Sequence, residues 1–105
     1  MNFELTDEQR AVRDMAQDFA ERRVKPIASE LDHESRFPKE IMEEMASLKL
    51  LGVCIPEDLG GAGMDMISYV LALEEVAKVC ASTAVIMSVN NSLVCEPIHR
   101  FGNDF

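Results

Sequence analysis

The sequence predicts an all-α fold, because three observations agree. Apolar residues recur at intervals of three and four over long stretches, and residues that cap helices precede those stretches. No segment alternates apolar and polar residues as a half-buried strand would. The 105 residues, 48% hydrophobic and 28% charged, have an ordinary globular composition and suffice for one domain. We expect about five helices that pack up and down.

The first helix is predicted to begin after Thr6, because the segment Thr6-Asp7-Glu8-Gln9 has the pattern of a capping box. Apolar residues then keep helical spacing from Val12 to Leu31, and their phase is the same on both sides of Pro26. A proline inside a helix removes a backbone hydrogen bond and bends the helix. We therefore expect one long helix with a kink at Pro26, followed by a polar break over residues 32–36.

The second helix is expected to open at Phe37-Pro38, with the proline in the first turn, where its missing N–H costs nothing. Its apolar face consists of Ile41, Met42, Met45 and Leu48. Gly52 is predicted to end this helix in the left-handed conformation. Residues 55–63 include three glycines and are predicted to form a loop in which several positions can take a positive φ.

The third helix is predicted to start from a cap at Asp65 or Ser68 and to run to about Cys80. It is apolar on almost every side, apart from three charged residues, Glu74, Glu75 and Lys78. Such a helix is expected to be buried on more than one side. The chain therefore carries more apolar surface than a small helical domain can hide, which predicts that residues 1–105 are one domain of a larger protein.

The fourth helix is predicted to start at Ser82 or Thr83 and to run to about Val94, and Pro97 opens a short fifth helix that stops at Gly102. Polar residues lie within the apolar fourth segment: Ser88, Asn90, Asn91 and Ser92. A buried amide without a partner costs roughly 1–3 kcal/mol. These groups either bond to loops or caps inside the domain, or the segment lines a pocket shared with another domain. Both interpretations stay open at this point.

The charge balance argues against several partners. Ten basic and nineteen acidic residues give a formal charge of −9, which disfavours nucleic acid and anionic membrane surfaces. Residues 79–95 carry no charge, but their serine, threonine and asparagine residues favour a buried helix over a membrane span. The N-terminus has no signal-peptide core. Three cysteines in apolar surroundings predict buried free thiols in a reducing compartment: Cys54, Cys80 and Cys95.

No residue pattern here predicts catalysis, metal binding or cofactor binding. The Gly60–Gly63 segment lacks the lysine and the preceding strand of a phosphate loop, so we interpret it as a turn. Adjacent Glu74 and Glu75 project about 100° apart on a helix and cannot form a facing acid–base pair, which favours solvated or salt-bridged roles. His99 is expected on the surface. Four further groups match no metal-ligand spacing: Asp32, His33, Glu34 and Asp58.

Several segments, taken in order, resemble the N-terminal domain of acyl-CoA dehydrogenases. They are Leu5-Thr6-Asp7-Glu8-Gln9, Ala28-x-Glu30-x-Asp32-x4-Phe37-Pro38, Gly52-Val53-x-Ile55-Pro56-Glu57-x2-Gly60-Gly61-x-Gly63-Met64-Asp65, Glu74-Glu75-Val76-Ala77, Ser88-Val89-Asn90-Asn91-Ser92-Leu93, Pro97-Ile98 and Phe101-Gly102. The stretch Met87–Leu93 is most similar to the short-chain, or butyryl-CoA, branch. The resemblance covers essentially the whole chain.

The resemblance implies a function for a larger parent protein. Such enzymes use FAD to oxidise an acyl-CoA to the trans-2-enoyl-CoA in fatty-acid β-oxidation, and electron-transfer flavoprotein reoxidises the flavin. They have a helical first domain, a β middle domain and a C-terminal helical bundle, and they form homotetramers. This chain corresponds to the first domain, so we expect it alone to be inactive and to hold no FAD. The expected location is a bacterial cytoplasm, or the mitochondrial matrix if a transit peptide has been removed.

The resemblance also implies two sets of site residues. Four are expected to line the acyl pocket: Ile86, Val89, Asn90 and Leu93. Three are expected to contact electron-transfer flavoprotein: Ala62, Met64 and Leu71. No acid in this segment matches the catalytic base. The alternatives are the first domain of a related acyl-CoA oxidase, nitroalkane oxidase or flavin monooxygenase, and a stand-alone helical interaction module.

Overall fold

The structure is a computed structural model that describes residues 4–34 and 38–103. These residues form four helical rods and contain no strand. The first rod joins α1 (Asp7–Phe19), the π-helical turn η1 (Ala20–Val24) and α2 (Lys25–Glu34). Two single helices follow, α3 (Lys39–Ser47) and α4 (Met66–Val79), with the 3₁₀ turn η2 (Glu57–Leu59) between them. The last rod joins α5 (Ala81–Val89), the π-helical turn η3 (Asn90–Cys95) and α6 (Glu96–Phe101).

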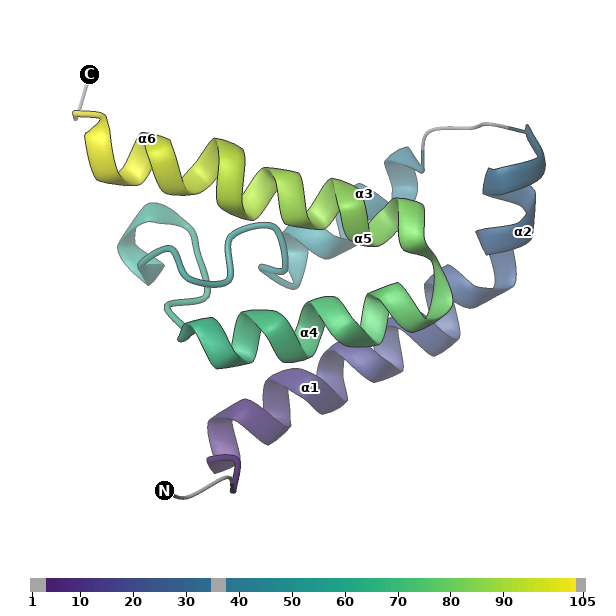
Figure 1. Cartoon of the computed structure of the whole chain (residues 1–105), viewed down its shortest axis with the longest axis horizontal. Coiled ribbons are helices and arrows are strands. Elements are labelled where there is room, and N and C mark those ends of the chain that lie inside the picture. The colour runs from purple at the N-terminus through teal and green to yellow at the C-terminus, as the bar shows by residue number, and fades with distance from the viewer. Residues whose placement is uncertain (1–3, 35–37, 104–105) are drawn as a thin grey trace.

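The rods alternate in direction along the chain, which confirms the predicted all-α, up-and-down arrangement (Figure 1). α4 lies in the middle, where it packs against α1 and η1 on one side and against α5 on the other. α3 runs back behind α5, and the first rod bends sharply where α2 begins (Figure 1). Because α4 contacts both long rods, its small and apolar residues set the distance between them.

The first rod confirms both of its predicted features. Thr6 accepts a hydrogen bond from the Gln9 backbone at 3.1 Å, and the Gln9 side chain accepts one from the Thr6 N–H at 2.9 Å, so the capping box is complete. The helix is bent around Pro26 and continues through Glu34, so it extends three residues into the predicted polar break. The wide turn η1 ends two residues before Pro26 and includes the residue four positions before it, whose carbonyl would collide with the proline ring in a regular helix.

The end of α3 differs from the prediction. Gly52 does not take a positive φ; Lys49 does, with φ 64°. Lys49 N–H donates to the Ala46 carbonyl, and Leu50 N–H donates to the Met45 carbonyl at 2.9 Å, which is the Schellman pattern. Met45 and Leu50 are both fully buried, so apolar burial at the turn outweighs the strain of a lysine in this conformation. Pro38 is the N-cap residue and does not lie in the first turn as predicted, because α3 begins at Lys39; Phe37 lies outside the described residues.

Residues 52–64 form a loop with two arms joined by backbone hydrogen bonds. Gly63 N–H donates to the Ile55 carbonyl at 2.8 Å, and Met64 N–H donates to the Val53 carbonyl at 2.9 Å. Gly60 and Gly63 take positive φ values of 92° and 66°, as predicted for this loop. A Cβ at Gly61 would lie 2.1 Å from the Ile55 carbonyl oxygen, so only glycine lets the arms approach. The glycines are therefore explained by the turn itself.

The remaining helices agree with the sequence in type and differ in their bounds. Asp65 caps α4 as predicted, by accepting a hydrogen bond from Ser68 N–H at 2.8 Å. α5 begins at Ala81 with Cys80 in the cap position, earlier than the predicted Ser82 or Thr83. α6 contains Pro97 in its first turn and ends before Gly102, as predicted, although it follows η3 without a break.

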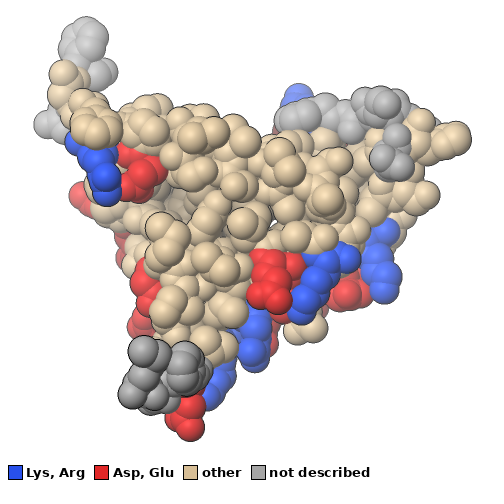
Figure 2. Space-filling view, in the orientation of Figure 1, with Lys and Arg blue, Asp and Glu red and all other residues tan. Residues whose placement is uncertain are grey.

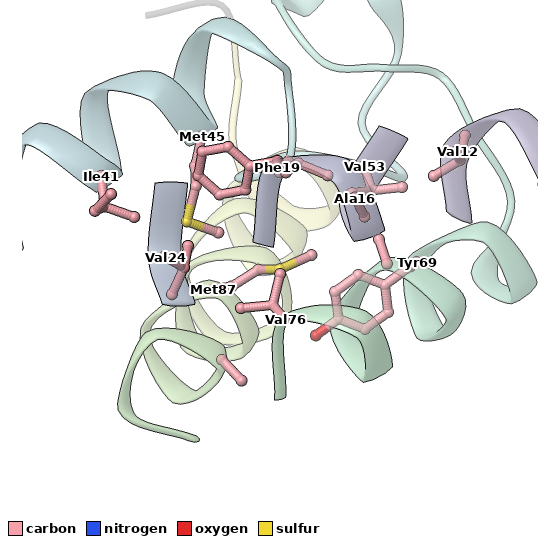
Figure 3. Close-up of a cluster of buried hydrophobic side chains, with 13 residues drawn as sticks. Val12, Ala16, Phe19, Val24, Ile41, Met45, Val53, Tyr69, Val76 and Met87 are labelled. Atoms are coloured by element: carbon pink, nitrogen blue, oxygen red, sulfur yellow. The ribbon is translucent and has the colours of Figure 1, made fainter. Parts of the chain in front are cut away.

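One apolar core lies between the rods (Figure 3). Phe19, Met45 and Met87 meet there from α1, α3 and α5, while Tyr69 and Val76 enter from α4. Ile41 and Met45 are buried as predicted, Met42 is partly buried, and Leu48 at the end of α3 remains 37% exposed. Outside the core, Arg23 Nε donates to both carboxylate oxygens of Glu44, at 2.8 and 2.9 Å, and so ties η1 to α3.

We predict that Lys49→Gly stabilises the protein. The left-handed conformation costs an L-residue roughly 1–2 kcal/mol, and part of that gain is offset by the greater freedom of glycine in the unfolded chain. The free energy of unfolding should rise by up to about 1 kcal/mol, measured by chemical denaturation. Lys49→Ala keeps the Cβ and should give no gain. An equal gain for both variants would show that the lysine side chain, and not its backbone strain, is unfavourable.

Candidate functional site

The most distinctive local structure is the wide turn η3, in the rod that carries the predicted pocket residues. At its entrance the Asn90 N–H donates to the carbonyls of Ile86 and Met87. At its exit the Glu96 N–H donates to the Asn91 carbonyl five residues earlier. Wide turns of this kind are rare and occur frequently at functional sites. The turn ends two residues before Pro97, just as η1 ends two residues before Pro26.

Asn91 is the buried polar centre of this turn, with 9% of its surface exposed. Its Nδ2 donates to the Leu50 and Met87 carbonyls, both at 2.9 Å. Its Oδ1 accepts from the Val53 N–H at 2.8 Å. The side chain thus has three partners, two of which lie about forty residues away in sequence. It fastens the start of the two-armed loop to the last rod.

Asn90 supports the same attachment. Its Nδ2 donates to the Leu51 carbonyl at 2.7 Å and lies 3.5 Å from Cys95 Sγ. These contacts bear out one of the two interpretations that the sequence left open, because both amides bond to a loop inside the domain. Asn90 also lines a hollow of about 210 Å³, together with Leu51, Gly52 and Cys95. It is therefore a structural anchor that also lines this hollow.

The other predicted pocket residues lie on the outer side of the same rod. Val89 is 42% exposed and Leu93 is 70% exposed, while Ile86 is partly buried. Val89 and Leu93 belong to a set of apolar residues that are between 42% and 82% exposed: Val85, Val89, Leu93, Val94, Ile98 and Phe101. Figure 2 shows that the face over α5 and η3 carries few charges, whereas charges line the edge formed by α1.

α4 adds to this exposed apolar surface. Met66, Ile67 and Val70 are between 51% and 63% exposed, so the prediction that this helix is buried on more than one side holds only where it contacts α1 and α5. Glu75 is buried and pairs with Lys78 at 3.3 Å, whereas Glu74 is exposed. Each acid therefore has one of the two roles predicted for the pair.

A second hollow, of about 250 Å³, opens between the loop, α4 and the last rod. Its lining includes Cys54, Tyr69 and Asn91, with the Glu96–Arg100 ion pair beside them at 3.4 Å. Burial raises the pKa of the Cys54 thiol, and the carboxylates of Glu96 and Asp65 raise it further. Cys54 is therefore a neutral thiol and a poor nucleophile at pH 7. All three cysteines are free, and they are partly buried where full burial was predicted.

Two of the three residues predicted for partner docking lie close together, and the third does not join them. Ala62 and Met64 lie on the second arm of the loop and line a hollow of about 190 Å³, with Val12 and Met15 of α1 opposite them. Leu71 is partly buried on α4 and does not line this hollow. The structure thus brings two of the three together.

Within residues 4–34 and 38–103, no helix combines the length and apolar character needed to cross a membrane. In the same described part, no three histidine, cysteine, aspartate or glutamate side chains gather as metal ligands. The side chains of Asp32 and Glu34 lie outside the described set. His99 is exposed on α6, as predicted.

Comparisons with known proteins agree with the fold. The family "Acyl-CoA dehydrogenase, N-terminal domain" matches residues 6–105. A short-chain specific acyl-CoA dehydrogenase, mitochondrial, from Mus musculus is 48% identical over 102 residues, covering 97% of this chain and 25% of that protein. Butyryl-CoA dehydrogenase from Megasphaera elsdenii superimposes with a TM-score of 0.91 at 39% identity, covering 99% of this chain and 28% of that one.

A further solved structure is described as the electron transferring flavoprotein of Acidaminococcus fermentans. One of its chains superimposes with a TM-score of 0.95 at 38% identity, covering 99% of this chain and 27% of that one. The chain therefore spans about a quarter of the length of the proteins it matches.

We predict that Asp65→Ala destabilises the protein in a pH-dependent way. Hydrogen bonds from Ser68 and from Gln9, whose Nε2 lies 2.8 Å from Asp65 Oδ2, lower the pKa of the Asp65 carboxyl. A lowered pKa in the folded state contributes stability above the unfolded pKa of about 3.9, and that contribution is lost as the pH falls through the folded pKa. Loss of the cap should cost about 1 kcal/mol at pH 7.

The difference between wild type and Asp65→Ala should therefore shrink as the pH falls below about 4. Urea denaturation at several pH values measures it. Asp58→Ala, which removes an exposed acid from the same loop, is the matched control and should have little effect. A difference that is the same at every pH would contradict the role of the charged carboxylate.

Proposed function

The chain belongs to the acyl-CoA dehydrogenase family as an N-terminal domain, and from this premise we propose that it is part of an FAD-dependent enzyme that oxidises a short-chain acyl-CoA to the trans-2-enoyl-CoA. The family match over residues 6–105 agrees with the resemblance found in the sequence. The observation that carries the proposal is 48% identity, over almost the whole chain, to a relative named short-chain specific. The relatives are about four times as long, which supports a role as one domain of a larger protein.

The described residues do not by themselves fit a flavin dinucleotide. The three hollows described above have volumes of about 190 to 250 Å³, below the roughly 300–1,000 Å³ of typical ligand sites. The glycine-rich loop is occupied by its own backbone hydrogen bonds. We therefore assign no catalytic step to this domain and expect the rest of the enzyme to hold FAD and to supply the base.

The contribution of this domain is a wall for the acyl chain. Val89 and Leu93 present exposed apolar surface, 42% and 70% of each residue, and Asn90 lies between them in sequence at the turn. An apolar wall of fixed depth selects chain length, because each methylene group that is excluded from an apolar pocket or admitted to it changes binding by about 0.8 kcal/mol. That energy corresponds to about a fourfold change in rate per methylene.

Electron transfer requires a second surface. The hollow beside Ala62 and Met64 offers an apolar, adaptable contact on a braced loop, which suits a transient protein partner. We propose electron-transfer flavoprotein as that partner, with Leu71 at the edge of the contact. We further propose that the whole enzyme is a homotetramer and that it is located in a bacterial cytoplasm or in the mitochondrial matrix. One structural relative being described as an electron transferring flavoprotein supports the partner.

The direct test is oxidation of butyryl-CoA by the full-length protein with an artificial dye as acceptor. We expect bound flavin, formation of the enoyl-CoA and slow reaction of the reduced enzyme with oxygen. Fast reoxidation by air would favour the related oxidases or monooxygenases. Absence of flavin and of turnover would favour the helical interaction module. The domain alone should show neither flavin binding nor turnover.

Widening the wall should shift the chain-length preference. In the full-length enzyme, Val89→Ala is expected to raise kcat/KM for hexanoyl-CoA relative to butyryl-CoA by about fourfold or more, because it removes two methyl groups from the wall. Val70→Ala makes the same truncation at an exposed site on α4 and should leave the ratio unchanged. Equal ratios in both variants would contradict contact between Val89 and the acyl chain.

A charge in the proposed docking hollow should slow electron transfer selectively. Met64→Glu is expected to lower kcat/KM for electron-transfer flavoprotein by about tenfold or more, since an unpaired charge would have to lose its water at an apolar contact. Turnover with the small dye is the internal control and should change little. A parallel loss with both acceptors would show that the substitution damages the enzyme itself.

A further inference from the structure

The wide turn η3 determines how the proposed wall residues are oriented. A single wide turn inserts about one extra residue, so every later side chain is rotated by about 100° relative to an uninterrupted α-helix. Val89 lies immediately before the turn and Leu93 lies within it. The angle between these two side chains is therefore a property of the turn, and so is the shape of the surface that they form together.

The wide turn η3 is accompanied by a following proline and by a buried amide. Comparison with η1 in the first rod distinguishes the effects of these two features. A proline follows both wide turns, at Pro26 and at Pro97, so a proline suffices to explain why each rod widens. Among the described residues, η3 also has an anchor for which η1 shows no counterpart, the buried amide of Asn91. η1 is held to α3 by the Arg23–Glu44 ion pair, which lies at the surface.

The Asn91 amide acts on the turn and the loop together. Nδ2 donates to the Met87 carbonyl at the entrance of the turn, where backbone bonding changes from the α to the π pattern. The same amide holds the Leu50 carbonyl and the Val53 N–H of the loop. The Asn91 side chain is directed inward and is buried, while Val89 and Leu93 are exposed. It can therefore influence them only through the backbone.

We propose that Asn91 is a positioning residue that sets chain-length selectivity without touching the acyl chain. By fixing the wide turn against residues 50–53, it fixes the directions of Val89 and Leu93. This inference rests on the proposed function of the domain as the acyl-pocket wall. Loss of the amide would let the turn shift or widen, and the wall would then reject longer chains less strictly.

The test compares butyryl-, hexanoyl- and octanoyl-CoA as substrates of full-length variants. Asn91→Asp keeps the acceptor for Val53 N–H and loses both donated bonds. Asn91→Ser is the second variant, because its smaller side chain leaves room for a water molecule to satisfy the loop. In either variant the kcat/KM ratio of butyryl-CoA to octanoyl-CoA should fall by about fourfold or more, mainly through KM.

Two controls separate positioning from loss of stability. Ile41→Val truncates a buried residue on α3 and lowers stability without altering the amide contacts. Ser92→Ala removes the neighbouring exposed hydroxyl, which donates to the Ser88 carbonyl at 2.6 Å. Both should retain the wild-type ratio. A ratio that changes equally in Ile41→Val would overturn the proposal, because selectivity would then follow stability.

The remaining outcomes are also decisive. An unchanged ratio in a flavin-loaded Asn91 variant overturns the positioning role and leaves the proposed function intact. Failure of both Asn91 variants to fold and bind flavin also overturns it, because Asn91 would then serve the fold alone. Absence of acyl-CoA oxidation in the wild type would overturn the proposed function first, and this inference with it.

Discussion

The hydrogen bonds of one buried amide, Asn91, join the last rod to the end of α3 and to the loop that follows it. Asn91 must satisfy a carbonyl oxygen and an amide group away from water, and it does so with backbone groups of Leu50, Val53 and Met87. Val53 in turn accepts a bond from Met64, so the constraint passes from the last rod into both arms of the loop. The end of α3, the glycine-rich turn and the last rod therefore keep a common geometry.

Local physics explains how much of this fold the sequence could predict. The capping box at Thr6, the cap at Asp65 and the bend at Pro26 each depend on residues within one or two turns, and all three were predictable. The end of α3 was not, because the left-handed position falls on Lys49 for the sake of burying Leu50. Glycine is the residue favoured at a left-handed helix end, so the sequence pointed to Gly52. The burial of Leu50 instead ends the helix earlier, at Lys49.

The candidate site was predictable only in part, for a related reason. The unusual feature of Asn90 and Asn91, amides in an apolar helix, was visible in the sequence, and it left two interpretations open. Their partners lie about forty residues away, and no local pattern identifies them. The wide turn was also hidden, since a proline at position 97 is equally compatible with a new helix. That turn sets the directions of the exposed Val89 and Leu93 side chains relative to each other.

The chain-length selectivity proposed for this domain requires that the outer side of η3 be a wall of the acyl pocket. A structure of the full-length enzyme with a bound, non-oxidisable acyl-CoA analogue tests it directly. We expect side-chain atoms of Val89 and Leu93 within about 4.5 Å of the acyl chain, with the Asn91 amide still bonded to the loop. An acyl chain that lies away from η3, with both side chains covered by protein instead, would contradict the role of η3 as a pocket wall.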